Sequence, residues 1–456
     1  MNDLRVPGIV LGTLLLLANI QGVPINSSCC QLSLPLPNIS LIAGGQNGTW
    51  FKADQDPRLF KVNLTTVESD KLPTFNSQGT IWSGSTNGTN WLISGWGNDR
   101  YDANPPIIIY DSSFHIISRS NEPDSHSSWY GGDIFASSHG AYGWLLSGLG
   151  SGYLGGISGN HMSLALFNGS NFTDLSSSVP RNQLGILFAN QWNGSLWMVG
   201  GGFRLKGLLF TFNGTSIHDL TGQVSDAMQI LGPVTSLGWN GTDWLIGGYE
   251  SLAIYNGHKF VDLTALLASV VGKQFHAVNA ISWDKLDNMW LLAGGYPKAD
   301  LRPGTAWAAA LSSSGQAKNL SSLISPYLTS ANSSSILTAT FNNGLWAVGG
   351  YKTKGKQVTP ILLIISLPAN TVTDISRTVD DTTYVIWIQF NPLTQHPVTQ
   401  PRPRCDLTNE PRGFSRCAGD EVLISSHANV VALSSLTSHW IASIAQCLSR
   451  KIPVFG

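Results

Sequence analysis

The sequence predicts an all-β fold, a seven-bladed β-propeller built from four-stranded antiparallel blades. The first observation behind this prediction is a pair of small residues ending in glycine, which closes a short apolar run seven times. The pairs are Gly44-Gly45, Ser94-Gly95, Ser147-Gly148, Gly200-Gly201, Gly247-Gly248, Gly294-Gly295 and Gly349-Gly350. The second observation is their regular spacing, because a period of roughly 40–50 residues with several strands per unit is typical of a propeller.

The fifth repeat shows the four strands of one blade in order. They are expected at 235–239, 244–246, 251–255 and 260–263. Asn240-Gly241 joins the first two strands and Asn256-Gly257 joins the last two. Both dipeptides suit a type I′ hairpin turn, in which both central residues take a positive φ. The other repeats carry the same turns and apolar runs at matching places.

The first repeat lacks an inner strand before Leu41, whereas the apolar run 384–388 near the end of the chain has no blade of its own. We expect this run to supply the missing inner strand of blade one. Such a closure removes exposed sheet edges, which otherwise invite aggregation. The alternative is a six-bladed ring with the first repeat acting as a cap.

The chain divides into four predicted segments. Residues 1–23 have the positive charge, short apolar core and exit of a secretory signal peptide. Residues 24–390 form the propeller, and residues 391–420 form a Pro-rich linker. Residues 421–456 form a short C-terminal helical tail, with a weak membrane anchor as the alternative. We therefore expect the protein to be secreted or held at the cell surface.

Five Asn-X-Ser/Thr sequons fall in the turns that join the first to the second strand or the third to the fourth strand of a blade. We predict glycosylation on this turn-bearing face, at Asn87, Asn168, Asn193, Asn213 and Asn240. The alternative is that Asn-Gly turns followed by Ser or Thr create the sequon pattern without carrying a glycan.

The opposite face, formed by the loops after the glycine pairs and between blades, is the predicted ligand face. Loops on a rigid scaffold often carry function. Aromatic and charged side chains around such a face suit sugars or peptides. The candidate ligand-binding residues are Asp99, Arg100, Tyr101, Arg204, Tyr249, Glu250, Tyr296, Arg302 and Tyr351. Ordinary solvated loops are the alternative interpretation.

No catalytic or metal-binding residues and no cofactor are predicted, because no zinc spacing, phosphate-binding loop or nucleophile motif occurs. The net charge of −1 at pH 7 gives no broad basic footprint, so a nucleic-acid partner is not expected. None of the five cysteines lies between residues 31 and 404, so the propeller contains no thiolate ligand.

The double glycine after the second strand resembles the propellers of the kelch and galactose-oxidase class over residues 38–390. This resemblance implies the fold. It departs from the kelch pattern because a Trp precedes the glycines, as in Trp244 and Trp346, and a Tyr directly follows them in three repeats. The Ser/Thr-rich texture also looks similar to secreted archaeal propellers. The copper site of galactose oxidase needs a Tyr–Cys cross-link, which this propeller cannot form.

These observations favour a secreted or cell-surface glycosylated propeller that acts as a binding module for an extracellular glycan or protein. A membrane contact is expected only through the C-terminal segment. One alternative is a carbohydrate-active hydrolase or lyase of the sialidase type, in which Arg100, Arg204 and Arg302 would form an arginine cluster. The other alternative is a structural component of the cell envelope.

Overall fold

The computed structural model divides the chain into two compact units, Met1–Gln395 and His396–Gly456. In the second unit only β31 (Pro403–Cys405) and β32 (Cys417–Gly419) are described, and they pair antiparallel. In the first unit the structure describes residues 40–391, apart from gaps at 48–55, 75–77, 99–106, 121–131, 151–152, 155–156, 159–160, 181–184, 204–205, 229–231, 273–274, 296–304, 330, 332, 356, 368 and 381–382.

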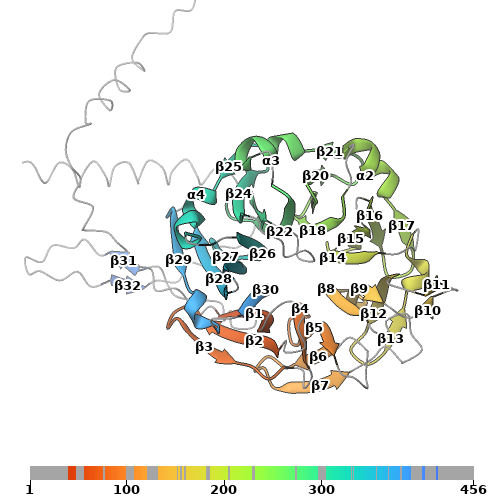
Figure 1. Ribbon diagram of the computed structural model, residues 1–456, viewed down its shortest axis with the longest axis horizontal. Coiled ribbons are helices and arrows are strands. Elements are labelled where there is room, and N and C mark those ends of the chain that lie inside the picture. Colours follow the sequence, from red (N-terminus) through yellow and green to blue (C-terminus); the bar gives the residue numbers. More distant parts are fainter. Residues whose placement is uncertain are drawn as a thin grey trace, which may run out of the picture. The chain divides into compact units, whose positions relative to one another are not determined.

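The first unit is a ring of seven four-stranded antiparallel sheets within these described residues, with one innermost strand per sheet around a central channel (Figure 1). From the innermost strand outward, blade one contains β30 (Thr383–Phe390), β1 (Ser40–Asn47), β2 (Asp56–Asn63) and β3 (Glu68–Lys71). Blade two contains β4 (Gln78–Thr86), β5 (Trp91–Asn98), β6 (Ile107–Tyr110) and β7 (Ile116–Ser120). The prediction of seven blades is confirmed, and the six-blade alternative was wrong.

Blades three to five follow the same order. Blade three contains β8 (Asp133–Gly140), β9 (Gly143–Gly150), β12 (His161–Phe167) and β13 (Phe172–Asp174), and the small hairpin β10 (Tyr153–Leu154) and β11 (Ile157–Ser158) lies between β9 and β12 in the chain. Blade four contains β14 (Ile186–Trp192), β15 (Trp197–Phe203), β16 (Lys206–Phe212) and β17 (Ile217–Asp219). Blade five contains β18 (Val234–Trp239), β19 (Trp244–Gly248), β20 (Ser251–Tyr255) and β21 (Phe260–Asp262), close to the strands predicted for this repeat.

Blades six and seven complete the ring. Blade six contains β22 (Ala277–Asp284), β23 (Met289–Gly295), β24 (Trp307–Ser312) and β25 (Ala317–Asn319). Blade seven contains β26 (Ser333–Asn342), β27 (Leu345–Lys354), β28 (Gln357–Ser366) and β29 (Thr371–Asp374). Short helices follow five outer strands: η2 (Ser176–Ser178), α2 (Thr221–Met228), α3 (Thr264–Val271), α4 (Ser321–Ile324) with η3 (Ser325–Tyr327), and η4 (Ser376–Thr378).

The same side-chain hydrogen bonds recur where five outer strands end, before η2, α2, α3, α4 and η4. In blade four, Asp219 Oδ1 accepts a hydrogen bond of 2.8 Å from the backbone N–H of Thr221. The Thr221 hydroxyl in turn accepts from the Leu209 N–H of the neighbouring strand at 3.1 Å. Leu220, between them, is fully buried. The repeated sequence, Asp or Asn, then Leu or Ile, then Ser or Thr, therefore anchors the end of the outer strand to its blade.

The glycine pair allows two close contacts of the second strand, one with the inner strand of its own blade and one with the next blade. The second glycine lies against a carbonyl of the inner strand: a Cβ added to Gly350 would overlap the Ser335 oxygen and lie 2.9 Å from the Ile336 Cα. The first glycine leaves room for an aliphatic side chain from the next blade. Added Cβ atoms at Gly44, Gly247 and Gly349 would lie 2.6–2.7 Å from atoms of Ile81, Val278 and Val385. The pair therefore sets the spacing both within and between blades.

Blade six shows that the predicted pairing was offset by one residue. Gly294, not Gly295, is the glycine next to the bulge of the inner strand, where an added Cβ would overlap the Ala277 carbonyl. The equivalent pair is therefore Ala293-Gly294. Gly295 has a φ of 151°, a conformation that side chains rarely adopt. This local backbone requirement explains why a third small residue follows the pair.

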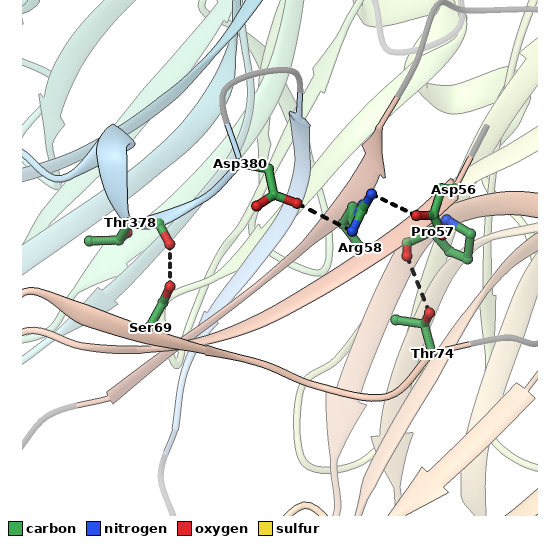
Figure 2. Close-up of polar contacts among 7 residues, drawn as sticks. All are labelled: Asp56, Pro57, Arg58, Ser69, Thr74, Thr378 and Asp380. Atoms are coloured by element: carbon green, nitrogen blue, oxygen red, sulfur yellow. Dashed lines mark hydrogen bonds and ion pairs between the residues drawn. The ribbon is translucent and has the colours of Figure 1, made fainter. Parts of the chain in front are cut away.

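The predicted ring closure is confirmed, because β30 pairs antiparallel with β1. Figure 2 shows the polar contacts beside this joint. The Arg58 guanidinium lies 2.6 Å from Asp56 and 3.3 Å from Asp380, which precedes β30. The Ser69 hydroxyl donates to the Thr378 carbonyl. Side chains of β2 and β3 thus bind the segment that leads into β30 and hold it against the first blade.

The predicted segments 1–23 and 421–456 lie outside the described residues, as does most of 391–420. Among the helices that the structure does describe, none has the length and apolar character needed to span a membrane.

Candidate functional site

Each inner strand contains a β-bulge opposite the glycine pair. One residue of the inner strand is left without a partner on the second strand, and a bulge of this kind redirects its side chain. In the seven blades the bulged residues are Trp82, Phe135, Phe188, Thr235, Asn279, Leu337 and Ile386. We call these seven residues the bulge ring. The ring places a variable side chain at the same level of every inner strand.

The bulge ring borders a cavity of about 170 Å³ in the central channel, to which all seven inner strands contribute. Six ring members line it, and Ile386 instead packs in a buried cluster with Trp82 and Leu337. One side of the cavity is aromatic. The Trp82 and Phe135 ring centroids lie 4.8 Å apart, and those of Phe135 and Phe188 lie 5.6 Å apart.

Asn190, two residues after Phe188 on β14, belongs to the cavity wall and directs its side-chain amide toward the adjacent blade. Its Nδ2 donates to the Ala136 carbonyl at 3.1 Å, the Leu145 carbonyl at 3.2 Å and the Ser147 hydroxyl at 2.8 Å. Since carbonyls only accept, these contacts fix which end of the amide is nitrogen. Asn190 is 8% exposed, and its Oδ1 is closed off from solvent and has no hydrogen-bond partner within the described residues.

Ser137, on the adjacent inner strand β8, has a partly exposed side chain. Its hydroxyl oxygen accepts from the Ser83 hydroxyl at 3.3 Å and from the Ser85 hydroxyl at 3.2 Å. A serine hydroxyl that accepts twice still has its own proton to donate. Ser137 lines the cavity together with Asn190. The cavity therefore presents the Ser137 hydroxyl as a rotatable donor, whereas the Asn190 amide joins blades three and four.

The cavity lining is uncharged. Its residues are Trp, Phe, Leu, Ile, Ala, Gly, Ser, Thr and Asn, with no Asp, Glu, Lys, Arg or His. A titratable residue does stand on one of the lining strands: Asp133, at the start of β8 and two positions before Phe135. Burial raises the pKa of the Asp133 carboxyl from 3.8 to about 7. An acid with this pKa can hold or release a proton near neutral pH.

Three of the nine predicted ligand-binding residues are described. Tyr249 is partly exposed and pairs with Ala277 in an isolated β-bridge, and the adjacent Glu250 is exposed. Tyr351 is 1% exposed, and its ring lies 5.1 Å from that of Tyr384. Because the Tyr351 side chain is buried beside the bulge ring, it lies behind the surface on which we expected a ligand.

Glu250 and His276 form a constrained pair on the predicted ligand face. Both have a positive φ, 49° and 26°, a conformation that is uncommon for residues other than glycine. The Glu250 N–H donates to the His276 carbonyl at 2.6 Å, and the two side chains approach to 3.8 Å. Such strain often occurs at functional positions. The pair holds a carboxylate and an imidazole together between blades five and six.

The other six predicted ligand-binding residues lie outside the described residues: Asp99, Arg100, Tyr101, Arg204, Tyr296 and Arg302. Their part in binding therefore stays a prediction, as does the arginine cluster of the sialidase alternative. Within the described ranges, no group of three or more His, Cys, Asp or Glu side chains could hold a metal ion.

The five predicted glycosylation sites all occupy one kind of tight turn. Asn240 illustrates it: Oδ1 accepts from the Thr242 N–H at 2.8 Å, the Asp243 N–H at 2.6 Å and the Thr242 hydroxyl at 3.0 Å. The same Asn side-chain cap recurs at Asn87, Asn168, Asn193 and Asn213. Asn256 caps an equivalent turn with His258 in the hydroxyl position. The turn thus explains the Asn, and glycan attachment stays a prediction.

The sequence analysis missed the cavity residues, although a signal for them exists. Before each glycine pair the inner strand reads aliphatic, bulged residue, then usually a small residue: Ile81-Trp82-Ser83, Ile134-Phe135-Ala136 and Leu187-Phe188-Ala189, for example. The aliphatic residue packs toward the neighbouring blade, as Ile81 does against Gly44. The middle residue varies most in chemistry, which is the property expected of a position that faces the channel.

Comparison with known proteins adds little beyond the fold. No family model and no curated protein matches the chain. A proposed 6-phosphogluconolactonase from Bacteroides uniformis ATCC 8492 aligns with a TM-score of 0.46 and 10% identity, covering 77% of this chain and 99% of that one. Sqt1 from Chaetomium thermophilum aligns at 0.37 with 13% identity over 68% and 75%, and Sqt1 from Saccharomyces cerevisiae at 0.42 with 9% identity over 76% and 95%. TM-scores this low carry no functional argument, and the kelch resemblance rests on the glycine repeats alone.

Proposed function

We propose that this chain is a secreted or cell-surface binding module whose ligand is an uncharged glycan, taken at the central channel. One observation carries the proposal: an uncharged cavity that combines aromatic rings with a serine hydroxyl able to donate a hydrogen bond. A sugar ring has apolar C–H faces and a rim of hydroxyl groups. The aromatic side chains suit the former, and the neutral polar groups suit the latter.

Secretion and glycosylation belong to the same proposal. The signal-like residues 1–23 and the five sequons on the turn-bearing face support an extracellular location. Glycans attached to that face would leave the loop face and the bulge ring open to a ligand. The alternative partner of such a binding module is a protein bound on the loop face. The Glu250–His276 pair would then form part of the surface that contacts this protein.

The test uses the full chain, purified from a secreting eukaryotic host and incubated with a broad panel of soluble glycans. Mass spectrometry then records both which glycans are retained and whether any product appears. We expect retention of neutral glycans without product. If no glycan is retained, the glycan-binding proposal fails, and a protein partner captured on the loop face becomes the better hypothesis.

A carbohydrate-active hydrolase is the second candidate function, and Asp133 favours it. General acids of glycoside hydrolases need a raised carboxyl pKa, and burial raises the pKa of Asp133 to about 7; Asp133 stands on a lining strand but is not itself one of the cavity lining residues. In this case the panel would release product, and Asp133→Asn would abolish the release while leaving retention in place. Product formation that survives Asp133→Asn would remove Asp133 from the chemistry.

A further inference from the structure

We infer that Cys405 and Cys417 form a disulfide bond that joins β31 to β32 in the second unit of the chain. This inference goes beyond the proposed function, because it concerns a covalent link outside the propeller. It takes from that proposal only the passage of the chain through an oxidising compartment, where disulfides form and persist.

The strand register brings the two cysteines together. Cys405 is the last residue of β31 and Cys417 is the first residue of β32, and the antiparallel register sets them directly opposite each other. Residues directly opposite in an antiparallel pair share one face of the sheet. The pairing therefore places two thiol-bearing residues at one position of one face.

Pro403 shows which kind of pair the cysteines form. Opposed pairs in an antiparallel ladder alternate between hydrogen-bonded pairs, in which each residue donates and accepts, and non-hydrogen-bonded pairs. Pro403 lies opposite Gly419 and has no N–H to donate, so theirs is a non-hydrogen-bonded pair. Cys405 stands two positions further along, so the Cys405–Cys417 pair is of the same kind. In such pairs the Cα atoms lie about 4.5 Å apart, a separation that a disulfide can span.

The shortness of the two strands gives such a bond a role. β31 and β32 have three residues each, and an isolated pair of strands is only marginally stable in water. A cross-link between them removes unfolded conformations of the intervening chain. Cys417 is also the nearest cysteine to Cys405 in the sequence, 12 positions away, whereas Cys447 is 42 positions away. A shorter loop costs less entropy to close, which favours the Cys405–Cys417 pair.

The bond forms by thiol–disulfide exchange with an oxidant that itself carries a disulfide, such as an oxidoreductase of the secretory route or oxidised glutathione. The thiolate of one cysteine attacks the disulfide of the oxidant and gives a mixed disulfide, and the second thiolate then displaces the oxidant. The two protein thiols lose two protons and two electrons in total. The disulfide of the oxidant accepts them and becomes two thiols.

The experiment maps the disulfides of the full chain. The protein is purified from the medium of a secreting eukaryotic host, its free thiols are blocked with N-ethylmaleimide, and it is digested without reduction. Trypsin releases the peptide 405–412, and Glu-C cleavage after Glu421 separates Cys417 from Cys447. Mass spectrometry should show the peptide 405–412 joined to the peptide 417–421. Reduction should release both peptides.

The variant Cys417→Ser should leave Cys405 free, so the blocking reagent should modify Cys405 in nearly every molecule. Cys447→Ser is the matched control, and it should keep the link between Cys405 and Cys417. Urea denaturation shows that each variant is folded. The inference is overturned if, in most molecules of the unmodified chain, Cys405 carries the blocking reagent or is joined to another cysteine.

Failure of secretion has a different result. A chain found only inside the host cells would contradict the proposed extracellular location, and its thiols would stay reduced because of the compartment. The chain is then purified, reduced and oxidised again in a glutathione buffer. The link between Cys405 and Cys417 should still form there, and its absence would overturn the inference.

Discussion

Gly350→Ala is the sharpest test of the role assigned to the glycine pairs. The added methyl would overlap the Ser335 carbonyl oxygen and lie 3.0 Å from its carbonyl carbon. Since both atoms belong to backbone, no side chain can rotate away. The strands β26 and β27 must separate, which strains the packing and weakens ladder hydrogen bonds beside the bulge. Overpacking costs about 1–3 kcal/mol and each lost hydrogen bond about 0.5–1.5 kcal/mol, so we expect about 3 kcal/mol of destabilisation.

The assay is equilibrium urea denaturation followed by tryptophan fluorescence, with the free energy taken from the midpoint and slope. Gly222→Ala is the matched control. It lies in helix α2, with nothing within 4 Å of an added Cβ. This control should stabilise the protein by about 0.5–1 kcal/mol through helix propensity. If Gly350→Ala costs less than about 1 kcal/mol, close carbonyl approach does not explain the glycine pair.

Three further predictions follow from the joint, the channel and the turns. Arg58→Met should destabilise the protein by about 1–2 kcal/mol and Asp380→Asn by less, because Asp56 still pairs with Arg58 at 2.6 Å; equal losses in urea denaturation would contradict this ordering. Asp133 in the folded protein keeps a proton up to pH about 7 that the unfolded chain releases near 3.8, so its contribution to stability should be full at low pH and fall between pH 4 and 7. Asp133→Asn should remove that fall, and a variant whose denaturation midpoints follow the wild-type pH profile would refute the assignment. Thr242→Val should remove the glycan at Asn240 while Thr242→Ser keeps it, as read by intact mass before and after N-glycosidase; a glycan at Asn256, which caps the same turn without a sequon, would show that the turn and not the sequon selects the site.

The strand plan was predictable because each of its signals is local. Asn-Gly marks the turn between Trp239 and Trp244, and the small-Gly pair marks the end of the second strand. The joint between β30 and β1 was predictable because the first repeat lacks an inner strand and the apolar run 384–388 has no blade of its own. The offset in blade six arose because three small residues stand in a row, 293–295. Only the pairing of two strands shows which glycine faces the carbonyl.

The candidate site was less predictable because it depends on how distant strands meet. A bulge belongs to a pair of strands, so neither strand alone shows that Phe188 or Asn279 turns toward the channel. The cavity then requires seven such strands to converge. Charged residues in the loops drew the sequence prediction to the loop face. The uncharged cavity residues lie inside strands, where an Asn or Ser could equally serve the packing of the blade.

A crystal structure of the full chain bound to its tightest neutral glycan tests the central claim most directly. The account predicts a neutral glycan in the channel cavity, against Phe135 and Phe188. A glycan bound only on the loop face, with water filling the cavity, would contradict it.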